Sequence, residues 1–278
     1  MPGTPENSLV AALAAEFSSR KPMRTGSLIT TIYGDVVAPR GGTLWLGSLL
    51  PLLHAFSIND SQARTAMSRL VDDQWLSANR IGRKSYYTLT DVGRARFHEA
   101  TRRIYAGAPS VWSGDFCIVI VPGGPNVQRD QLRKELGWIG FGTLSAGILV
   151  HPDPDEAALG NVLSRATKTA DRPVVIRGVN DPTNSATALA QMVEDCWSLQ
   201  DLSDDYRAFV ERFSPLGQAL SEDTPLSTWD CLRARVMLIH EYRRIILRDP
   251  LLPTQLLPKD WAGTHARELA REIYQQIV

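Results

Sequence analysis

Polar and basic side chains between residues 61 and 74 have types and spacing that suit contact with DNA. A helix over this range places Ala63, Ala66, Met67 and Leu70 on one apolar face, which would pack on a core. The other face carries Ser61, Gln62, Thr65, Ser68, Arg69 and Asp72, with Arg64 on its flank. Hydroxyl, amide and guanidinium groups form hydrogen bonds with base edges and phosphates. A solvated face of an ordinary helix would show the same pattern, so the neighbouring elements decide between the two interpretations.

A basic hairpin is predicted directly after this helix. One strand begins at residues 75–76, a turn containing Gly82 spans residues 79–84, and a second strand covers residues 85–89. Three cations fall at its tip: Arg80, Arg83 and Lys84. A purely structural hairpin has no need of this charge, whereas a wing that lies along a phosphate backbone does.

Two apolar helices are expected upstream, at residues 26–37 and 43–56, with Pro51 kinking the second. Residues 57–60 then form a turn, and Asp60 is the expected N-cap of the third helix. Helix, helix, turn, helix and wing is the order of a winged helix-turn-helix, so the sequence predicts this DNA-binding fold.

The charge distribution supports a DNA-binding domain over residues 20–106, closed by a basic helix at residues 90–104. The whole chain is neutral, with 30 Lys and Arg against 30 Asp and Glu. Residues 20–107 contain 13 basic and 6 acidic residues, a net charge of +7, and the remainder carries −7. Such asymmetry indicates a polyanionic partner for one part of the chain, although chance clustering of charges is the alternative.

Length and composition narrow the class of protein. A chain of 278 residues with 44% hydrophobic content is expected to form two or three domains with sizeable cores. The sequence has no run of about 18 apolar residues, so it predicts no membrane span. Residues 8–17 resemble a short amphipathic helix rather than a secretory signal. The three widely spaced cysteines suit a reducing cytoplasm without a disulfide framework.

The middle of the chain predicts a small ferredoxin-like domain over residues 112–180, after a linker at residues 107–114. Its expected elements are a strand at 116–121, a helix at 126–136, strands around 138–144 and 146–150, a helix at 155–168 and a strand at 174–179. The order β-α-β-β-α-β is that of the ferredoxin-like fold.

The remaining residues, 184–278, predict an all-helical domain, so the fold class is α+β overall. Helices are expected at residues 187–200, 203–213, 227–248 and 264–278, separated in part by Pro215 and Pro225. The proline-rich segment 249–258 should be extended or turned.

The sequence contains no constellation for covalent chemistry. A phosphate-binding Gly-x-x-x-x-Gly-Lys-[Ser/Thr] loop is absent. His240 and Glu241 begin a zinc-protease pattern, but Arg244 stands where the second histidine belongs. Cys117 lies in an apolar strand and is expected to be a core thiol rather than a nucleophile. We therefore expect no catalytic residues, no metal and no cofactor.

One predicted helix of the C-terminal domain concentrates arginines next to aromatic residues: Arg233, Arg235, His240, Tyr242, Arg243, Arg244 and Arg248. Guanidinium groups beside aromatic rings suit an anionic ligand that carries phosphate. The alternative is pairing with acidic residues of the preceding helices: Glu194, Asp195, Asp201, Asp204 and Asp205. Trp197 and Tyr206 are further ligand candidates, with core packing as the alternative.

Several stretches resemble the PaaX-like transcriptional repressors of phenylacetate and related aromatic catabolism. They are "APRGGTLWLGSLLPLL", "ARTAMSRLVDDQWL", "RIGRKSYYTLTDVGR", "GFGTLSAGILVHP", "CWSLQDLSDDYRAFVERFSPL" and "HEYRRIILRDPLLPTQLLPKDWAGTHA". The resemblance spans nearly the whole chain from residue 25 to residue 278. It implies a cytoplasmic homodimer that binds a palindromic operator in double-stranded DNA and is released by an aryl-CoA thioester such as phenylacetyl-CoA.

The resemblance also assigns roles to residues. The family's recognition-helix motif falls on residues 64–70 and its wing on residues 80–87, which adds Tyr86 to the DNA contacts. Gln74 departs from an expected glycine at the helix end. The helical C-terminal domain would hold the effector and the dimer contacts, with these effector candidates: Arg235, His240, Arg243, Arg244, Trp197 and Tyr206.

Two enzymatic alternatives remain open from the sequence. One is a CoA-thioester-handling enzyme, such as a thioesterase, fused to a DNA-binding module; it lacks a visible nucleophile and base. The other is a nuclease built on the ferredoxin-like domain, which would need a carboxylate or metal ligand at the end of the first strand. The only nearby carboxylate, Asp115, lies before that strand.

Overall fold

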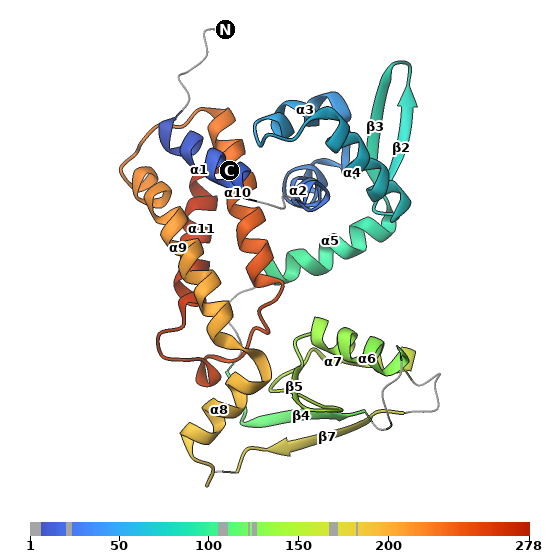
Figure 1. Ribbon diagram of the computed structural model, residues 1–278, viewed down its shortest axis with the longest axis vertical. Coiled ribbons are helices and arrows are strands. Elements are labelled where there is room, and N and C mark those ends of the chain that lie inside the picture. The colour runs from blue at the N-terminus through green and yellow to red at the C-terminus, as the bar shows by residue number, and fades with distance from the viewer. Residues whose placement is uncertain are drawn as a thin grey trace. The chain divides into compact units, whose positions relative to one another are not determined.

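The computed structural model describes residues 7–20, 24–104, 111–121, 123, 127–166, 172–181 and 183–278. The chain forms two compact units (Figure 1). The first unit comprises Met1–Ala106, Arg207–Ile246 and Thr264–Val278, and the second comprises Gly107–Tyr206 and Leu247–Gly263. The mixed helices and small sheets confirm the predicted α+β class.

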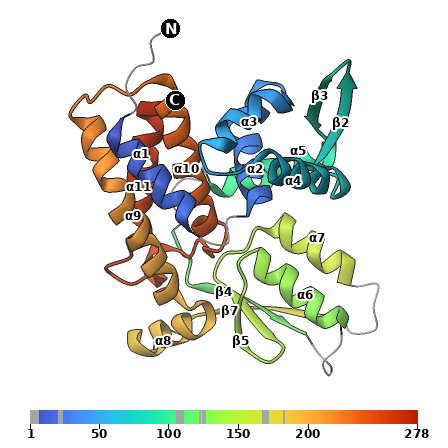
Figure 2. The ribbon, with the colours of Figure 1, turned by 45° about the horizontal axis from the view of Figure 1, so that its top comes forward.

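The N-terminal part of the first unit is a winged helix-turn-helix preceded by a short helix. Its elements are α1 (Ser8–Ser19), α2 (Thr25–Ile32), a π-helix (Tyr33–Val37), a 3-10 helix (Ala38–Arg40), β1 (Thr43–Trp45), α3 (Leu46–His54), α4 (Asp60–Asp72), β2 (Leu76–Ile81), β3 (Lys84–Leu89) and α5 (Asp91–Ile104). The three strands form an antiparallel sheet in the order β1-β3-β2. β2 and β3 extend as a hairpin beyond helices α3 and α4 (Figures 1 and 2).

Three expectations for this region are wrong in detail. Residues 43–45 are a strand and not the start of a helix, because Thr43 and Trp45 pair with β3 in a third strand that completes the sheet. Asn59, not Asp60, caps α4: its side chain accepts a hydrogen bond from the backbone of Gln62 at 2.9 Å, and the Gln62 side chain accepts one from the Asn59 backbone at 2.9 Å. The predicted helix at 26–37 changes to a π-helix at Tyr33.

Helices from the C-terminal part of the chain complete the first unit. They are α10 (Thr228–Ile246), α11 (Ala262–Ile277) from residue 264 onward, and α9 (Leu199–Ser221) from residue 207 onward. Pro215 lies inside α9, so the predicted break there is wrong. The Phe17 ring of α1 packs edge-on against Phe56, with ring centroids 5.3 Å apart, and against His240 of α10 at 5.4 Å.

A buried ion pair joins the winged helix to these C-terminal helices. Asp35 of the π-helix and Arg235 of α10 are each 7% exposed. Arg235 donates from Nε to Asp35 Oδ2 at 2.6 Å and from Nη2 to the Asp35 backbone oxygen at 2.8 Å. Tyr274 of α11 donates its hydroxyl to Asp35 Oδ1 at 2.8 Å, and its ring lies 5.0 Å from the guanidinium. Three segments far apart in sequence therefore meet at one charged cluster.

The second unit contains a four-stranded sheet with the predicted β-α-β-β-α-β order. Its elements are β4 (Asp115–Ile120), α6 (Val127–Trp138), β5 (Gly142–Ser145), β6 (Ile148–His151), α7 (Glu156–Ala166) and β7 (Val174–Val179). The strands are antiparallel in the order β5-β6-β4-β7, which is the ferredoxin-like arrangement. α6 and α7 lie together on one face (Figure 2).

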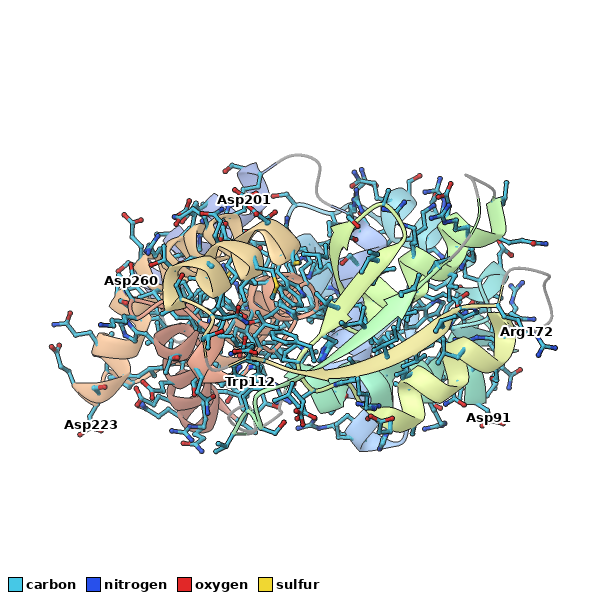
Figure 3. The ribbon with its side chains drawn as sticks, turned by 90° about the horizontal axis from the view of Figure 1, so that it is seen from below. Asp91, Trp112, Arg172, Asp201, Asp223 and Asp260 are labelled. Atoms are coloured by element: carbon cyan, nitrogen blue, oxygen red, sulfur yellow. The ribbon has the colours of Figure 1, made fainter. Side chains whose placement is uncertain are left out.

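The two faces of this sheet have separate cores. Cys117 and Val119 pack under the helices with Leu136, and burial raises the pKa of the Cys117 thiol, so its predicted core role is confirmed. On the other side α8 (Ala186–Trp197) packs with a 3-10 helix (Thr254–Leu256) from the proline-rich segment. Trp112, labelled in Figure 3, stacks edge-on with Phe116 in this second core, with ring centroids 5.1 Å apart.

Breaking the buried ion pair on one side should destabilise the protein strongly. We expect Arg235→Met to lower the free energy of unfolding by about 3–5 kcal/mol, because it leaves the Asp35 carboxylate buried without its cation. The double variant Asp35→Leu/Arg235→Met removes both charges and should recover much of that loss. Urea denaturation measures both changes, with Arg244→Met, at an exposed arginine of the same helix, as the control. Equal stability of the single and double variants would contradict the expectation.

Candidate nucleic-acid interface

Helix α4 separates an apolar face from a polar one as the sequence predicts. Ala63, Ala66, Met67 and Leu70 are buried. Six predicted DNA contacts are exposed on the same helix: Ser61, Gln62, Arg64, Thr65, Ser68 and Arg69. The Gln62 side-chain oxygen is engaged in the cap, and Arg64 lies 4.0 Å from Asp60. The helix therefore presents hydroxyl and guanidinium groups to solvent over most of its length.

The hairpin β2–β3 closes with a two-residue turn. Ile81 pairs with Lys84, which leaves Gly82 and Arg83 as the central residues. Gly82 has φ +60°, the left-handed conformation that a tight hairpin turn requires at its first central position. The wing is thus tighter than the six-residue turn that the sequence predicts, and both strands reach the tip.

The cations of the wing are all exposed, but their surroundings differ. Arg80 donates from Nε to the Gly82 backbone oxygen at 3.2 Å, and Lys84 Nζ lies 4.8 Å from the centre of the Trp45 ring. Tyr86 is half-buried and pairs with Trp45 across the sheet. The structure therefore places all ten predicted DNA contacts on α4 and the adjoining wing of one unit.

Two arginines of α5 that contribute to the local positive charge hold the winged helix together. Arg94 donates to the Gly41 backbone oxygen at 3.4 Å. Arg96 donates to the Asp73 backbone oxygen at 3.4 Å and lies 5.0 Å from the centre of the Trp75 ring. Arg96 therefore links α5 to the end of α4, and Arg94 links it to the turn before β1, while both charges add to the positive potential of the unit.

The six predicted effector contacts do not form one group. Arg235, His240, Arg243 and Arg244 belong to α10 in the first unit, whereas Trp197 and Tyr206 belong to the second unit. Trp197 donates from Nε1 to the Gly140 backbone oxygen at 2.9 Å, and the buried Tyr206 hydroxyl donates to Asp249 at 2.6 Å.

The arginines of α10 have partners in the structure. Arg235 pairs with Asp35, which the sequence did not connect to this helix. Arg243 donates from Nη1 to the Ser27 backbone oxygen at 3.2 Å and to Thr31 Oγ1 at 2.8 Å. Arg248 lies beyond the end of α10, in the second unit, and pairs with Asp205, one of the acidic residues named in the alternative interpretation. Arg244 is exposed and lies 3.6 Å from Glu241.

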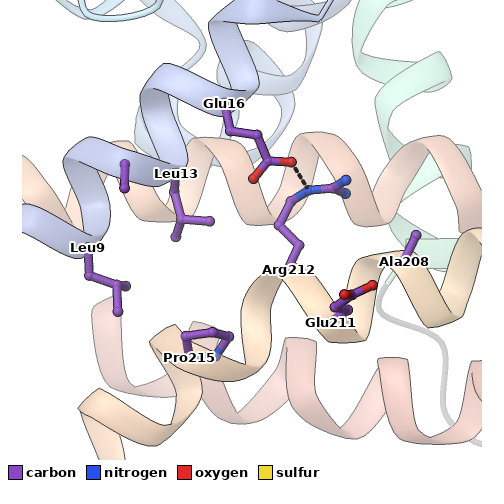
Figure 4. Close-up of a pocket in the computed structure, with 8 residues that line it drawn as sticks. Leu9, Leu13, Glu16, Ala208, Glu211, Arg212 and Pro215 are labelled. Atoms are coloured by element: carbon purple, nitrogen blue, oxygen red, sulfur yellow. Dashed lines mark hydrogen bonds and ion pairs between the residues drawn. The ribbon is translucent and has the colours of Figure 1, made fainter.

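An open groove of about 490 Å³ lies between α1 and α9 in the first unit (Figure 4). Leu9, Leu13 and Pro215 line it together with Glu16 and Arg212, which form an ion pair. Arg212 is also 3.5 Å from Glu241, so two carboxylates balance its charge. The groove offers apolar walls rather than a site for an anion, and none of the predicted effector contacts lines it.

His240 is buried in a cationic environment. Its Nδ1 lies 3.0 Å from Thr31 Oγ1. Burial, followed by the positive charges of Arg243 and Arg244, lowers the pKa of His240 from 6.5 to about 3. The imidazole is therefore neutral at physiological pH and gives no attraction to an anionic ligand.

Within the described ranges, no cluster of three or more His, Cys, Asp or Glu could hold a metal ion. No helix in the part of the chain that the structure describes is long and apolar enough to cross a membrane.

Three models of one protein family match successive segments of the chain. Residues 24–93 match the family model described as PaaX-like protein, residues 109–189 match the PaaX protein central Cas2-like domain, and residues 197–278 match the PaaX-like protein C-terminal domain. The chain is 36% identical over 257 residues to the Escherichia coli (strain K12) protein named transcriptional repressor PaaX, covering 92% of this chain and 81% of that one.

A solved structure supports the fold alone. The uncharacterized protein Rv0674 from Mycobacterium tuberculosis superposes with a TM-score of 0.58 at 21% sequence identity. The match covers 90% of this chain and 94% of that chain.

The buried histidine should make stability fall at acidic pH. An unfolded histidine binds its proton near pH 6.5, whereas folded His240 does so near pH 3, so the unfolded state binds more protons between these values. His240 should therefore remove up to about 1.4 kcal/mol of stability per pH unit as the pH falls below 6.5.

Urea denaturation at several pH values tests this expectation. His240→Gln should show a shallower loss of stability than the wild type between pH 6.5 and 4. His265→Gln makes the same change at an exposed position of α11 and serves as the control. Parallel curves for the wild type and His240→Gln would contradict the burial argument.

Proposed function

The chain belongs to the PaaX-like protein family, and we propose that it is a DNA-binding transcriptional repressor of an aromatic-catabolism operon of the phenylacetate type. The curated relative is named as a transcriptional repressor. The protein would act in the cytoplasm as a homodimer on a palindromic operator, and an aryl-CoA such as phenylacetyl-CoA would release it.

One observation carries the DNA-binding proposal: the exposed polar face of α4 and the cationic wing tip belong to the same unit. A helix with short hydrogen-bonding side chains can enter the major groove, where Arg69 would form paired hydrogen bonds with a guanine edge. Arg83 and Lys84, exposed beside the turn, would contact phosphates.

A palindromic operator requires two copies of this helix, and the second unit offers a surface where a dimer could form. β7 is at one edge of the four-stranded sheet. It has four exposed apolar side chains: Val174, Val175, Ile176 and Val179. An edge strand of this kind has backbone groups ready to pair with another strand, and a second β7 in antiparallel orientation would continue the sheet symmetrically.

The aryl-CoA proposal rests on the family and on the arginines of α10. A CoA thioester carries several phosphate charges, and arginine is suited to bind them. Arg244 is the exposed guanidinium among the predicted effector contacts, so it can meet such a ligand without opening the Asp35–Arg235 cluster. Release would follow if the effector binds more tightly to a dimer whose recognition helices no longer match the operator spacing.

Removing the recognition arginine should weaken binding to specific DNA. We expect Arg69→Ala to lose about 1–3 kcal/mol of operator affinity, roughly 5- to 150-fold, because one side chain would no longer read a base. A gel-shift titration against duplexes that the wild-type protein selects from a random pool measures this loss. Arg165→Ala removes the same charge from an exposed position of α7 and is the control. Unchanged specific binding of Arg69→Ala would reject the assignment of α4 as the recognition helix.

The effector proposal predicts direct binding of phenylacetyl-CoA to the pure protein. Isothermal titration should detect that binding, and the same ligand should release the selected duplex in a gel shift. Arg244→Ala should bind it more weakly, whereas Arg165→Ala should bind it as the wild type does. Absence of binding by phenylacetyl-CoA and by other aryl-CoA thioesters would reject the effector while leaving DNA binding intact.

A further inference from the structure

The structure brings the tryptophan at the end of β1 next to the lysine that follows the wing turn. Trp45 is the last residue of β1, and Lys84 is the first residue of β3. Lys84 Nζ lies 4.8 Å from the centre of the indole ring, within the range of a cation–π interaction. Trp45 is 36% exposed, so the pair lies at the surface of the unit. The sequence does not predict this contact, because it predicts a helix from residue 43 and no strand beside β3.

Two features of the local fold fix the position of the indole ring. Trp45 pairs with Tyr86 in the register between β1 and β3, which places it next to the wing strand. On its other side the ring lies against Gly47: a Cβ built there would be 2.3 Å from the indole. Only a residue without a side chain leaves this space, so the start of α3 is shaped to receive the ring.

A fixed ring has a consequence for the lysine. A lysine side chain has four rotatable bonds and carries a compact charge, so an exposed one samples many positions. The negative face of an indole attracts the ammonium and narrows this range. A cation held in advance beside the wing turn meets a phosphate with less loss of side-chain entropy than a freely moving one.

We propose that Trp45 is a positioning residue for DNA binding, which holds the Lys84 ammonium for a contact with a backbone phosphate. This inference rests on the proposed function, because it deepens the role of the wing. If Trp45 acts in this way, its contribution to DNA affinity depends on the presence of Lys84. The contribution should also be independent of DNA sequence, because ammonium–phosphate contacts position a protein without reading bases.

A double-mutant cycle tests the dependence. The wild type, Trp45→Leu, Lys84→Ala and Trp45→Leu/Lys84→Ala are titrated with a non-specific duplex at several salt concentrations. Lys84→Ala should reduce the salt slope by about one. Trp45→Leu should weaken binding by about 2- to 5-fold, the range of an exposed cation–π contact. In the Lys84→Ala background the same change should have little effect.

Further variants separate positioning from folding. Trp45→Phe keeps an aromatic face and should retain most of the affinity, and Trp138→Leu, which removes an exposed tryptophan from α6, should match the wild type. Gly47→Ala retains Trp45 but places a methyl group where the indole ring lies, so it should displace the ring and weaken DNA binding as Trp45→Leu does. If Trp45→Leu unfolds in thermal denaturation, Gly47→Ala and Trp45→Phe carry the test.

Two results would overturn the inference while the wild type still binds DNA with the expected salt dependence. One is an equal loss of affinity from Trp45→Leu with and without Lys84. The other is unchanged binding by both Trp45→Leu and Gly47→Ala. Absence of salt-dependent DNA binding by the wild type itself would instead reject the proposed function.

Discussion

The buried Asp35–Arg235 pair is the constraint on which the arrangement of the first unit depends. It joins residues 200 positions apart, and Tyr274 adds a third segment. A carboxylate and a guanidinium taken out of water are stable only together and with their remaining hydrogen bonds satisfied. The winged helix and the C-terminal helices are therefore one compact unit, and the ferredoxin-like sheet belongs to the other.

This constraint shapes how an effector could act in the proposed repressor. A ligand that contacts α10 would contact a helix that is bonded to the π-helix. Tyr33 of the π-helix in turn donates a hydrogen bond from its hydroxyl to the backbone oxygen of Tyr87 in the wing, at 3.3 Å. Coupling from the effector to the DNA-reading elements would then need no hinge inside the first unit. Because Asp35 ties the π-helix to α10, a displacement of α10 would carry the winged helix with it, and release would come from moving the unit as a whole.

Local patterns predicted much of the fold and the exposed faces of α4 and the wing. The separation of apolar and polar faces on α4 and the charge of the wing are properties of short segments, so Arg69 and Lys84 could be placed on the surface without knowing the rest of the chain. The element boundaries that were predicted wrongly depend on residues distant in the sequence. Residues 43–45 become a strand only because β3 lies beside them, and α9 continues through Pro215 because its apolar face is packed on both sides of that residue.

The predicted effector contacts do not form one group in the structure, because a cluster of arginines in sequence does not reveal its partners. Arg235 belongs to an ion pair with a residue of the N-terminal region, and the partners of Arg243 lie on α2. The Tyr206 hydroxyl donates a hydrogen bond to Asp249 in the second unit. Trp45 was missed for a related reason, since its contact with Lys84 depends on a strand pairing that no local pattern signals.

A hydroxyl-radical footprint on a duplex selected by the protein, with and without phenylacetyl-CoA, tests whether the protein is a ligand-released dimer on a twofold site. We expect two protected half-sites related by a twofold axis, with centres about one helical turn apart or a multiple of it, and loss of both when the thioester is added. A single unsymmetrical protected segment would contradict a dimer that reads DNA through two copies of α4 and its wing.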